Sequence, residues 1–244
     1  MEQKSGRSVE VCFTPNQFDQ YYTGQKVVVV IDVLRATSAI CTAFAHGVAR
    51  IIPVATVEEA EDYLKKGYMV GAERNGEVVD GFTFGNSPYS YMGDKVKGQT
   101  IVLTTTNGTQ AIHISRKAEN VVIGSLINLK AICDWLLEKN EDVLILCSGW
   151  KDKFNLEDTI CAGAIAEVLI GDGGFHYHED TTVAARYLFK SAEQSYFGFL
   201  RASSHRKRLK KLNLNKDIIY SLTPNQVDNV PILKDGAIVD WKSL

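Results

Sequence analysis

The 244-residue sequence lacks an excess of charge of either sign, since 27 Lys and Arg residues oppose 29 Asp and Glu residues. Proteins that bind nucleic acid generally carry a basic field, so this balance favours a small-molecule partner over nucleic acid. No stretch approaches the ~20 consecutive apolar residues that a membrane-spanning helix needs. The start, MEQKSGRSVEVCF, has no apolar run typical of a signal peptide. We therefore expect a cytoplasmic protein that does not bind membranes.

Cysteine is scarce and scattered, and no CxxC or Cys/His spacing predicts a structural zinc site. The number of cysteines is odd, and most lie inside apolar strand or helix patterns. We expect them to be reduced and buried as small apolar side chains rather than paired in disulfides. They are Cys12, Cys41, Cys133, Cys147 and Cys161.

Three familiar phosphate-handling motifs are also absent. Leu34 stands two residues after Asp32, so the Asp-x-Asp pair of haloacid-dehalogenase-type phosphatases is missing. The six residues after Cys147 contain no arginine, unlike the Cys-x5-Arg of thiol phosphatases. The chain has no GxxxxGK[ST] loop for a nucleotide either. These absences leave the known covalent-phosphoenzyme designs without support.

What the chain does contain is a regular alternation of strand and helix patterns. Residues 26–32, KVVVVID, form a short β-branched apolar run that is typical of a strand buried on both faces of a parallel sheet. The alternation predicts an α/β fold with a mainly parallel sheet. In the last third we expect two helices and, over 230–239, a closing hairpin or an edge strand. Further strands are predicted at 49–54, 68–72, 100–105, 120–123 and 142–147, with helices at 39–46, 56–67, from 107, 129–138 and 157–170.

Two parts of the sequence resemble each other at a nearly constant offset. Residues 37–40, TSAI, match residues 109–112, TQAI, and residues 50–52, RII, match residues 120–122, NVV. The matches predict an internal duplication of a βαβαβ unit, with chance similarity between two α/β stretches as the alternative. No linker interrupts the chain. We expect one compact domain over 1–244, which could comprise two lobes at about 1–99 and 100–244.

The chemistry should lie where strands turn into helices, because ligands of open α/β sheets bind beyond the carboxyl ends of the strands. Asp32 ends an otherwise apolar strand, where a carboxylate is costly unless it is paired, hydrogen-bonded or bound to a cation. This predicts a metal-binding or catalytic role, with capping of the following turn as the alternative. Arg35 offers a planar fork of donors for phosphate, carboxylate or sulfonate oxygens, with a surface ion pair as the alternative.

A second turn, residues 104–109 (TTTNGT), gathers hydroxyl groups, an amide and a glycine. Gly108 allows backbone N–H groups to approach a ligand, and Asn107 can donate to anionic oxygens. The turn predicts an oxyanion-binding cradle, with a Thr-rich strand end and a helix cap as the alternative.

Carboxylates follow two more predicted strands, at Glu73 and at Glu157 and Asp158. Hard cations such as Mg²⁺ prefer oxygen ligands of this kind. Acidic residues in a first helical turn also complement the helix dipole, so Glu157 and Asp158 have a structural alternative. Asp32, Glu157 and Asp158 are all candidate general bases.

Two other polar segments favour a surface location. His176 and His178 with Asp180 have a metal-like spacing, but they stand in a Gly-rich polar loop. Residues 205–211, HRKRLKK, predict a solvated basic helix face, from which one arginine could reach an anionic ligand.

Several of these segments together resemble the 2-phosphosulfolactate phosphatase family, the enzymes assigned to coenzyme M biosynthesis. They follow the family order over roughly the first two-thirds of the chain, and the last third resembles the family more loosely. Ser38 and Ser148 depart from the residues expected in many relatives, and both add a hydroxyl. The matching segments are 31–38 (IDVLRATS), 71–74 (GAER), 81–88 (GFTFGNSP), 105–109 (TTNGT), 124–125 with Asn128, 147–149 (CSG) and 154–158 (FNLED).

The resemblance implies Mg²⁺-dependent hydrolysis of 2-phospho-3-sulfolactate to 3-sulfolactate and phosphate on a three-layer α/β/α fold. It implies a small anionic substrate, and we also expect a homo-oligomer. Other small phosphorylated acids as substrates, or a non-catalytic phosphate-binding module, are the alternatives. Asp32, Glu73 and Asp158 would bind the cation. The implied catalytic set is Asp32, Arg35, Glu73, Asn107, Glu157 and Asp158, and the implied substrate-binding set is Arg35, Thr37, Ser38, Arg74, Asn86, Ser87, Thr105, Thr106, Asn107, Gly108, Thr109, Ser148 and Gly149.

Overall fold

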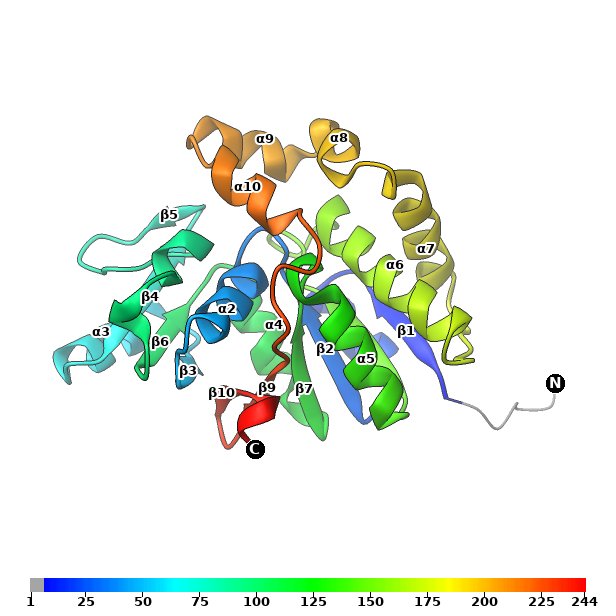
Figure 1. Ribbon diagram of the computed structural model, residues 1–244, viewed down its shortest axis with the longest axis horizontal. Helices are drawn as coiled ribbons and strands as arrows, with labels where there is room; N and C mark the ends of the chain where they lie inside the picture. The colour runs from blue at the N-terminus through cyan, green and yellow to red at the C-terminus, as the bar shows by residue number, and fades with distance from the viewer. Residues whose placement is uncertain (1–6) are drawn as a thin grey trace.

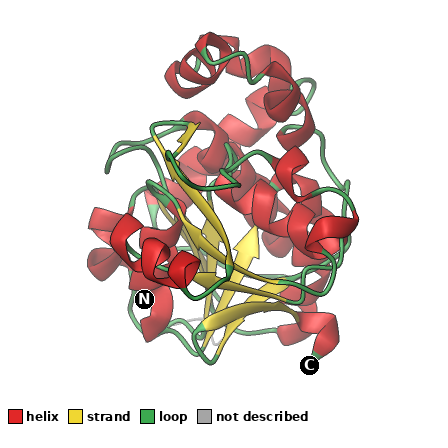
Figure 2. Cartoon of the chain, turned by 90° about the vertical axis from the view of Figure 1, so that its left-hand side faces the viewer, coloured by secondary structure: helices red, strands yellow, loops and turns green. Residues whose placement is uncertain are grey.

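The computed structural model describes residues 7–244, and helices lie on both sides of its strands (Figures 1 and 2). Residues 1–6, the front of the segment expected to lack a signal peptide, lie outside the described part. The strands are β1 (Val9–Cys12), β2 (Val27–Ile31), β3 (Arg50–Pro53), β4 (Met69–Arg74), β5 (Glu77–Val78), β6 (Thr100–Thr104), β7 (Asn120–Gly124), β8 (Val143–Cys147), β9 (Pro231–Lys234) and β10 (Ala237–Asp240). The helices are α1 (Phe18–Tyr21), α2 (Ala36–Ala45), α3 (Val57–Lys65), α4 (Gly108–Ile114), α5 (Leu129–Lys139), α6 (Leu156–Gly171), α7 (Asp180–Ala192), α8 (Tyr196–Phe199), α9 (Ser204–Lys211) and α10 (Asn215–Ser221).

The strands form one sheet in the order β1-β8-β2-β7-β9-β10-β3-β6-β4-β5. Strands β1, β8, β2 and β7 make a first parallel block, and β3, β6 and β4 make a second. The hairpin β9–β10 joins the two blocks through antiparallel contacts to β7 and β3. The expected hairpin at 230–239 is confirmed, but the edge position is wrong, because the hairpin completes the centre of the sheet.

Helices cover both faces of the first block, which confirms the predicted three-layer α/β arrangement. Strand β2 is buried along its whole length, and successive side chains point to opposite faces. Val27, Val29 and Ile31 join a core with residues of α5, α6 and α7. Val28 and Val30 join a second core with residues of α2 and α4. This burial on both faces explains why β2 is a continuous apolar run.

The two βαβαβ runs have equivalent topology. The first is β2-α2-β3-α3-β4, and the second is β6-α4-β7-α5-β8. Each run places its first strand between the other run's second and third strands, so β2 lies between β7 and β8, and β6 lies between β3 and β4. The predicted duplication required equal strand order and direction in the two halves, and the pairing has both. Strands from before position 99 pair with strands from after it, as β2 does with β7 and β3 with β6. Position 99 is where the two-lobe alternative placed its boundary, and the division into domains stays a prediction.

The last third contains more helices than the two that we expected. The structure has α7, α8, α9 and α10 there, and in Figure 1 the last three arch over the top of the view. Helix α9 was hard to recognise as a packed element because only His205 and Leu209 of its residues are buried. The five cysteines are all buried and free, as expected. Among residues 7–244, no helix has the length and apolar character needed to cross a membrane.

Candidate active site

Loops that follow β2, β4 and β6 meet at one small pocket. Asp32 and Arg35 come from the first loop, Glu73 and Asn86 from the end of β4 and the segment beyond it, and Asn107 from the third. The structure thus brings together five residues that the sequence singled out, while their roles stay predictions. Leu34, Gly76, Trp150, His205 and Leu209 complete the lining.

A close approach between α2 and α4 shapes this pocket. A Cβ atom added at Gly108 would lie 2.7 Å from the Ala36 Cβ and 3.1 Å from Asp32 Oδ2. Only a residue without a side chain lets the two helix starts come so near. Gly108 therefore sets the position of Asp32 against the 105–109 turn.

We expect Gly108→Ala to lower the free energy of unfolding by roughly 1–3 kcal/mol, the usual cost of an extra methyl in a packed site. Urea denaturation of the variant and wild type would measure the difference. Gly171→Ala, at the end of α6, serves as the glycine control, because its added Cβ meets no neighbour within 4 Å and its φ lies outside the left-handed region. An unchanged midpoint for Gly108→Ala would show that the two helices move apart without cost.

Asp32 is a buried carboxylate with little compensation. Its Oδ1 accepts one long hydrogen bond, 3.4 Å, from the Ala36 N–H. Burial, and then repulsion from Asp158 and Glu73, raises the pKa of Asp32 to about 8, whereas nearby His205 lowers it. The capping alternative for Asp32 holds in part, because this hydrogen bond comes from Ala36, the first residue of α2. Arg35, at the N-cap position, provides no side-chain hydrogen bond to the helix. Thr37 and Ser38 lie inside this helix.

Glu73 is buried, and both of its carboxylate oxygens accept hydrogen bonds. Its carboxylate accepts from the Gly76 N–H, from the Thr106 N–H at 3.2 Å and from Asn86 Nδ2 at 3.1 Å. The Thr106 hydroxyl adds a longer contact of 3.3 Å. Glu73 therefore ties the 105–109 turn to the end of β4. The Asn86 Oδ1 atom, in contrast, is buried and has no hydrogen-bond partner within residues 7–244.

Asp158 connects two loops through its carboxylate. Its Oδ1 accepts the Val33 N–H at 2.8 Å, and its Oδ2 accepts from the Gly149 N–H at 3.1 Å and from Asn155 Nδ2 at 2.9 Å. Burial, and then the charge of Glu157, raises the pKa of Asp158, while these hydrogen bonds oppose the rise. The geometry makes Asp158 a residue that positions the loops after β2 and β8.

Arg35 is buried and already paired. Its Nη1 donates to Asp217 Oδ2 at 2.6 Å, and its Nη2 donates to the Gly76 carbonyl at 2.7 Å. The ion pair is buried on both sides and connects the loop after β2 to α10. The alternative predicted for Arg35 was an ion pair at the surface. Arg35 does form an ion pair, but the alternative is wrong about its place, because neither partner is exposed.

Several threonines of the 105–109 turn bind one another. Thr105 and Thr109 exchange three hydrogen bonds between their hydroxyl groups and backbones. Asn107 Oδ1 accepts the Lys151 N–H at 3.0 Å, and Asn107 also lines the pocket. The hydroxyl groups of the turn are thus used by one another and by Glu73, and Asn107 is the residue of the turn that lines the pocket.

Other predicted substrate contacts lie outside the pocket lining. Arg74 donates to its neighbour's carbonyl and to the Thr104 hydroxyl, and Ser87 precedes a short helix. The Ser38 hydroxyl binds the Val33 carbonyl and the Ser125 hydroxyl. Thr37, Thr105, Thr106, Gly108, Thr109, Ser148 and Gly149 also lie outside the lining.

The sequence missed His205, and the prediction of a wholly solvated face for 205–211 is wrong at this residue. His205 is buried, and its Nδ1 lies 2.7 Å from Glu157 Oε1. Its ring packs 5.2 Å from the Trp150 ring, on whose face the Arg208 guanidinium lies at 4.4 Å. Glu157 lies in the first turn of α6, as its structural alternative as a complement to the helix dipole requires, and it is also fully buried against His205 and Ser203. A single histidine at the start of a basic helix gave no signal of this contact.

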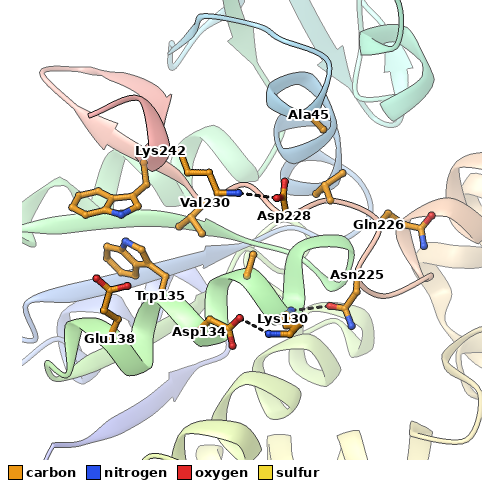
Figure 3. A pocket seen from close by; sticks show the side chains of 13 residues that line it. Ala45, Lys130, Asp134, Trp135, Glu138, Asn225, Gln226, Asp228, Val230 and Lys242 are labelled. Atoms are coloured by element: carbon orange, nitrogen blue, oxygen red, sulfur yellow. Dashed lines mark hydrogen bonds and ion pairs between the residues drawn. The ribbon is translucent and has the colours of Figure 1, made fainter.

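The pocket is almost filled. Its free volume of about 10 Å³ is close to what one water molecule requires. A far larger cavity of about 820 Å³ lies elsewhere, between α5 and the segment 225–242 (Figure 3). It shares no residue with the pocket and is lined by paired groups such as Lys130 with Asp134 and Lys242 with Asp228. The larger cavity therefore contains none of the predicted site residues.

Within residues 7–244, no group of three or more His, Cys, Asp and Glu side chains is spaced to hold a metal ion. Asp32, Glu73 and Asp158 therefore do not form a three-carboxylate ligand group in this arrangement. His176 and His178 pack against each other in a loop and form no such group either.

A mainly parallel α/β sheet whose strand ends converge on buried carboxylates and an arginine, with a histidine from a helix beside them, is the architecture of an enzyme that acts on a small polar ligand. The family model for 2-phosphosulpholactate phosphatase matches residues 12–236. The chain therefore belongs to this family and is a phosphoric monoester hydrolase.

Three relatives support this assignment, and each is named probable 2-phosphosulfolactate phosphatase. The Thermotoga maritima protein is 42% identical over 218 residues, which cover 88% of this chain and 92% of the relative. The Caldanaerobacter subterraneus protein is 38% identical over 229 residues, covering 92% and 95%. The Clostridium acetobutylicum protein is 37% identical over 234 residues, covering 95% and 99%.

Proposed function

We propose that this chain hydrolyses the phosphate ester of 2-phospho-3-sulfolactate to 3-sulfolactate and phosphate, with Mg²⁺ as cofactor, as a cytoplasmic enzyme of coenzyme M biosynthesis. The observation that carries the proposal is the family match over nearly the whole chain, together with a pocket to which the matching segments 31–38, 71–74, 81–88 and 105–109 contribute residues. Relatives of similar length carry the name of this activity.

The charges of the pocket fit a cation and a phosphate ester together. The substrate has phosphate, sulfonate and carboxylate groups, all anionic, and would enter a site lined by Asp32 and Glu73, with the charge of Asp158 acting on Asp32. The raised pKa of Asp32 reflects burial and uncompensated negative charge. A divalent cation would offset both the carboxylates and the phosphoryl oxygens.

The donor set fits Mg²⁺ at Asp32. Its Oδ2 accepts no hydrogen bond among the described residues, and Asn86 Oδ1 is a second oxygen without a partner in the pocket wall. Mg²⁺ commonly binds through one or two carboxylates, with waters and substrate phosphate completing the shell. Glu73 and Asp158 use both oxygens to accept hydrogen bonds, so we propose that they position the loops and contribute charge. When bound, the cation would polarise the phosphoryl group and activate water.

The chain's own residues orient the ester. Asn107 has an amide N–H₂ group in the pocket lining, because its oxygen is held by the Lys151 N–H. Arg35 keeps N–H groups beyond the two that bind Asp217 and Gly76. Both can donate to the phosphate or sulfonate oxygens and fix the ester for attack.

Phosphate release tests the proposal directly. We expect the purified protein to release phosphate from 2-phospho-3-sulfolactate with added Mg²⁺, to lose activity in excess EDTA, and to regain it when Mg²⁺ is restored. Phosphoglycerates, which lack the sulfonate, should react more slowly. Full activity in EDTA would reject the cofactor, and faster turnover of a phosphoglycerate would reject the proposed substrate.

A further inference from the structure

Helix α9 places one titratable ring in the wall of the pocket. His205 is 5% exposed, and Glu157 from α6 is fully buried beside it. The distance of 2.7 Å between Nδ1 and Oε1 is that of a strong hydrogen bond. The Ser203 hydroxyl donates to the second Glu157 oxygen at 3.2 Å, so the carboxylate itself is held. Glu157 thereby fixes the orientation of the imidazole.

The opposite side of the ring remains for a ligand. A hydrogen bond from the Nδ1–H to Glu157 leaves Nε2 as the second polar atom, and it has no hydrogen-bond partner in the part of the chain that the structure describes. His205 lines the pocket together with Asp32, and its charge acts on that carboxylate. Trp150 packs against the ring and restricts its movement. The charged groups around the ring are Glu157, Asp32 and Arg208 of its own helix.

Hydrolysis of an alkyl phosphate requires a proton donor for the leaving ester oxygen, and the other pocket residues do not provide one. The ester oxygen leaves as a strongly basic alkoxide unless it is protonated as the P–O bond breaks. Arg35 cannot give up a proton, and Glu73 accepts hydrogen bonds on both oxygens. Asp32 is the residue that fits the cation. His205 lines the pocket, is held in place by Glu157, and has in Nε2 a nitrogen without a partner among the described residues.

We propose that His205 is the general acid of the reaction and that Glu157 is its positioning residue, an inference that rests on the proposed phosphatase function. The ring acts as the imidazolium, with a proton on each nitrogen. As the P–O ester bond breaks, its electron pair goes to the ester oxygen, which takes the Nε2 proton and leaves as the hydroxy acid, and the ring is left neutral with its proton on Nδ1. The water that adds to phosphorus brings two protons. One returns Nε2 to its protonated form, and the other departs with phosphate, so the protons balance.

The leaving group provides the test. His205→Gln keeps an amide that can bind Glu157 but has no transferable proton. We expect kcat for the alkyl phosphate substrate to fall by roughly 10²–10⁴-fold, the usual contribution of a positioned acid. Hydrolysis of p-nitrophenyl phosphate, whose leaving group needs no proton, should fall by less than tenfold. His113→Asn, on an exposed face of α4, should leave both rates unchanged.

A structural role predicts a different pattern. If His205 only attached α9 to α6, the variant would lose both activities equally, and that result would overturn the inference. Added imidazole should restore part of the alkyl phosphate activity of His205→Ala, and a lack of rescue in a variant that unfolds at the wild-type temperature would count against it. Absence of wild-type turnover on either ester would instead overturn the proposed function.

Discussion

Replacement of Asp32 by asparagine is expected to lower kcat by roughly 10²–10³-fold, the usual effect of removing one preorganised electrostatic group. The amide keeps an oxygen but loses the charge that holds a hard cation. Binding of Mg²⁺, measured by isothermal titration calorimetry, should weaken in parallel. Wild-type Mg²⁺ affinity in the variant would show that Asp32 is not a ligand. Asp172→Asn changes an exposed carboxylate and serves as the control.

The same substitution should stabilise the metal-free protein. The pKa of Asp32 is about 8 in the fold, against an ordinary value of 3.8. The folded state therefore binds more protons than the unfolded state between these values, and wild-type stability falls as pH rises through this window. Asparagine removes this dependence, so the difference in melting temperature between variant and wild type should grow from pH 4 towards pH 8. A constant difference would show that Asp32 ionises normally in the folded protein.

Arg35→Lys should lower kcat/KM by roughly ten- to a hundredfold, which corresponds to the ~1.5–3 kcal/mol of a well-aligned charged hydrogen bond. Lysine keeps the positive charge but cannot reproduce the planar fork that orients two oxygens. Steady-state kinetics would separate the two ways of losing activity. A fall in kcat would place the contact in the transition state, and a rise in KM alone would indicate uniform binding.

The ion pair with Asp217 needs its own control, because Arg35 also connects the loop after β2 to α10. Asp217→Asn weakens that connection and leaves the guanidinium in place. We expect it to retain most activity. Equal losses in both variants would mean that Arg35 acts by holding α10 over the site, and near-wild-type constants in Arg35→Lys would remove it from the anion site altogether. Arg50→Lys, on an exposed position of β3, controls for the substitution itself.

The strands and the turns that bear the site were readable from the sequence because their signals are local. A strand buried on both faces must be a continuous apolar run, so β2 and β8 were found at nearly the right residues. A carboxylate directly after such a run is costly, which singled out Asp32. The matching segments of the two halves also predicted the equivalent βαβαβ units, since each unit is defined by local pattern.

The rest depends on residues that are distant in the sequence, and only the tertiary structure decided it. The position of β2 between β7 and β8, and that of β6 between β3 and β4, follow from pairing between segments that are separate in the sequence. The same is true of the central place of the hairpin β9–β10. Arg35 and Asp217 are 182 residues apart, and His205 and Glu157 are 48 residues apart. Helix α9 is mostly charged, so its pattern could not show which face is buried. That face is set by Glu157 and Trp150, which contact His205. Burying a polar side chain requires a partner, and the partner's position is a property of the fold.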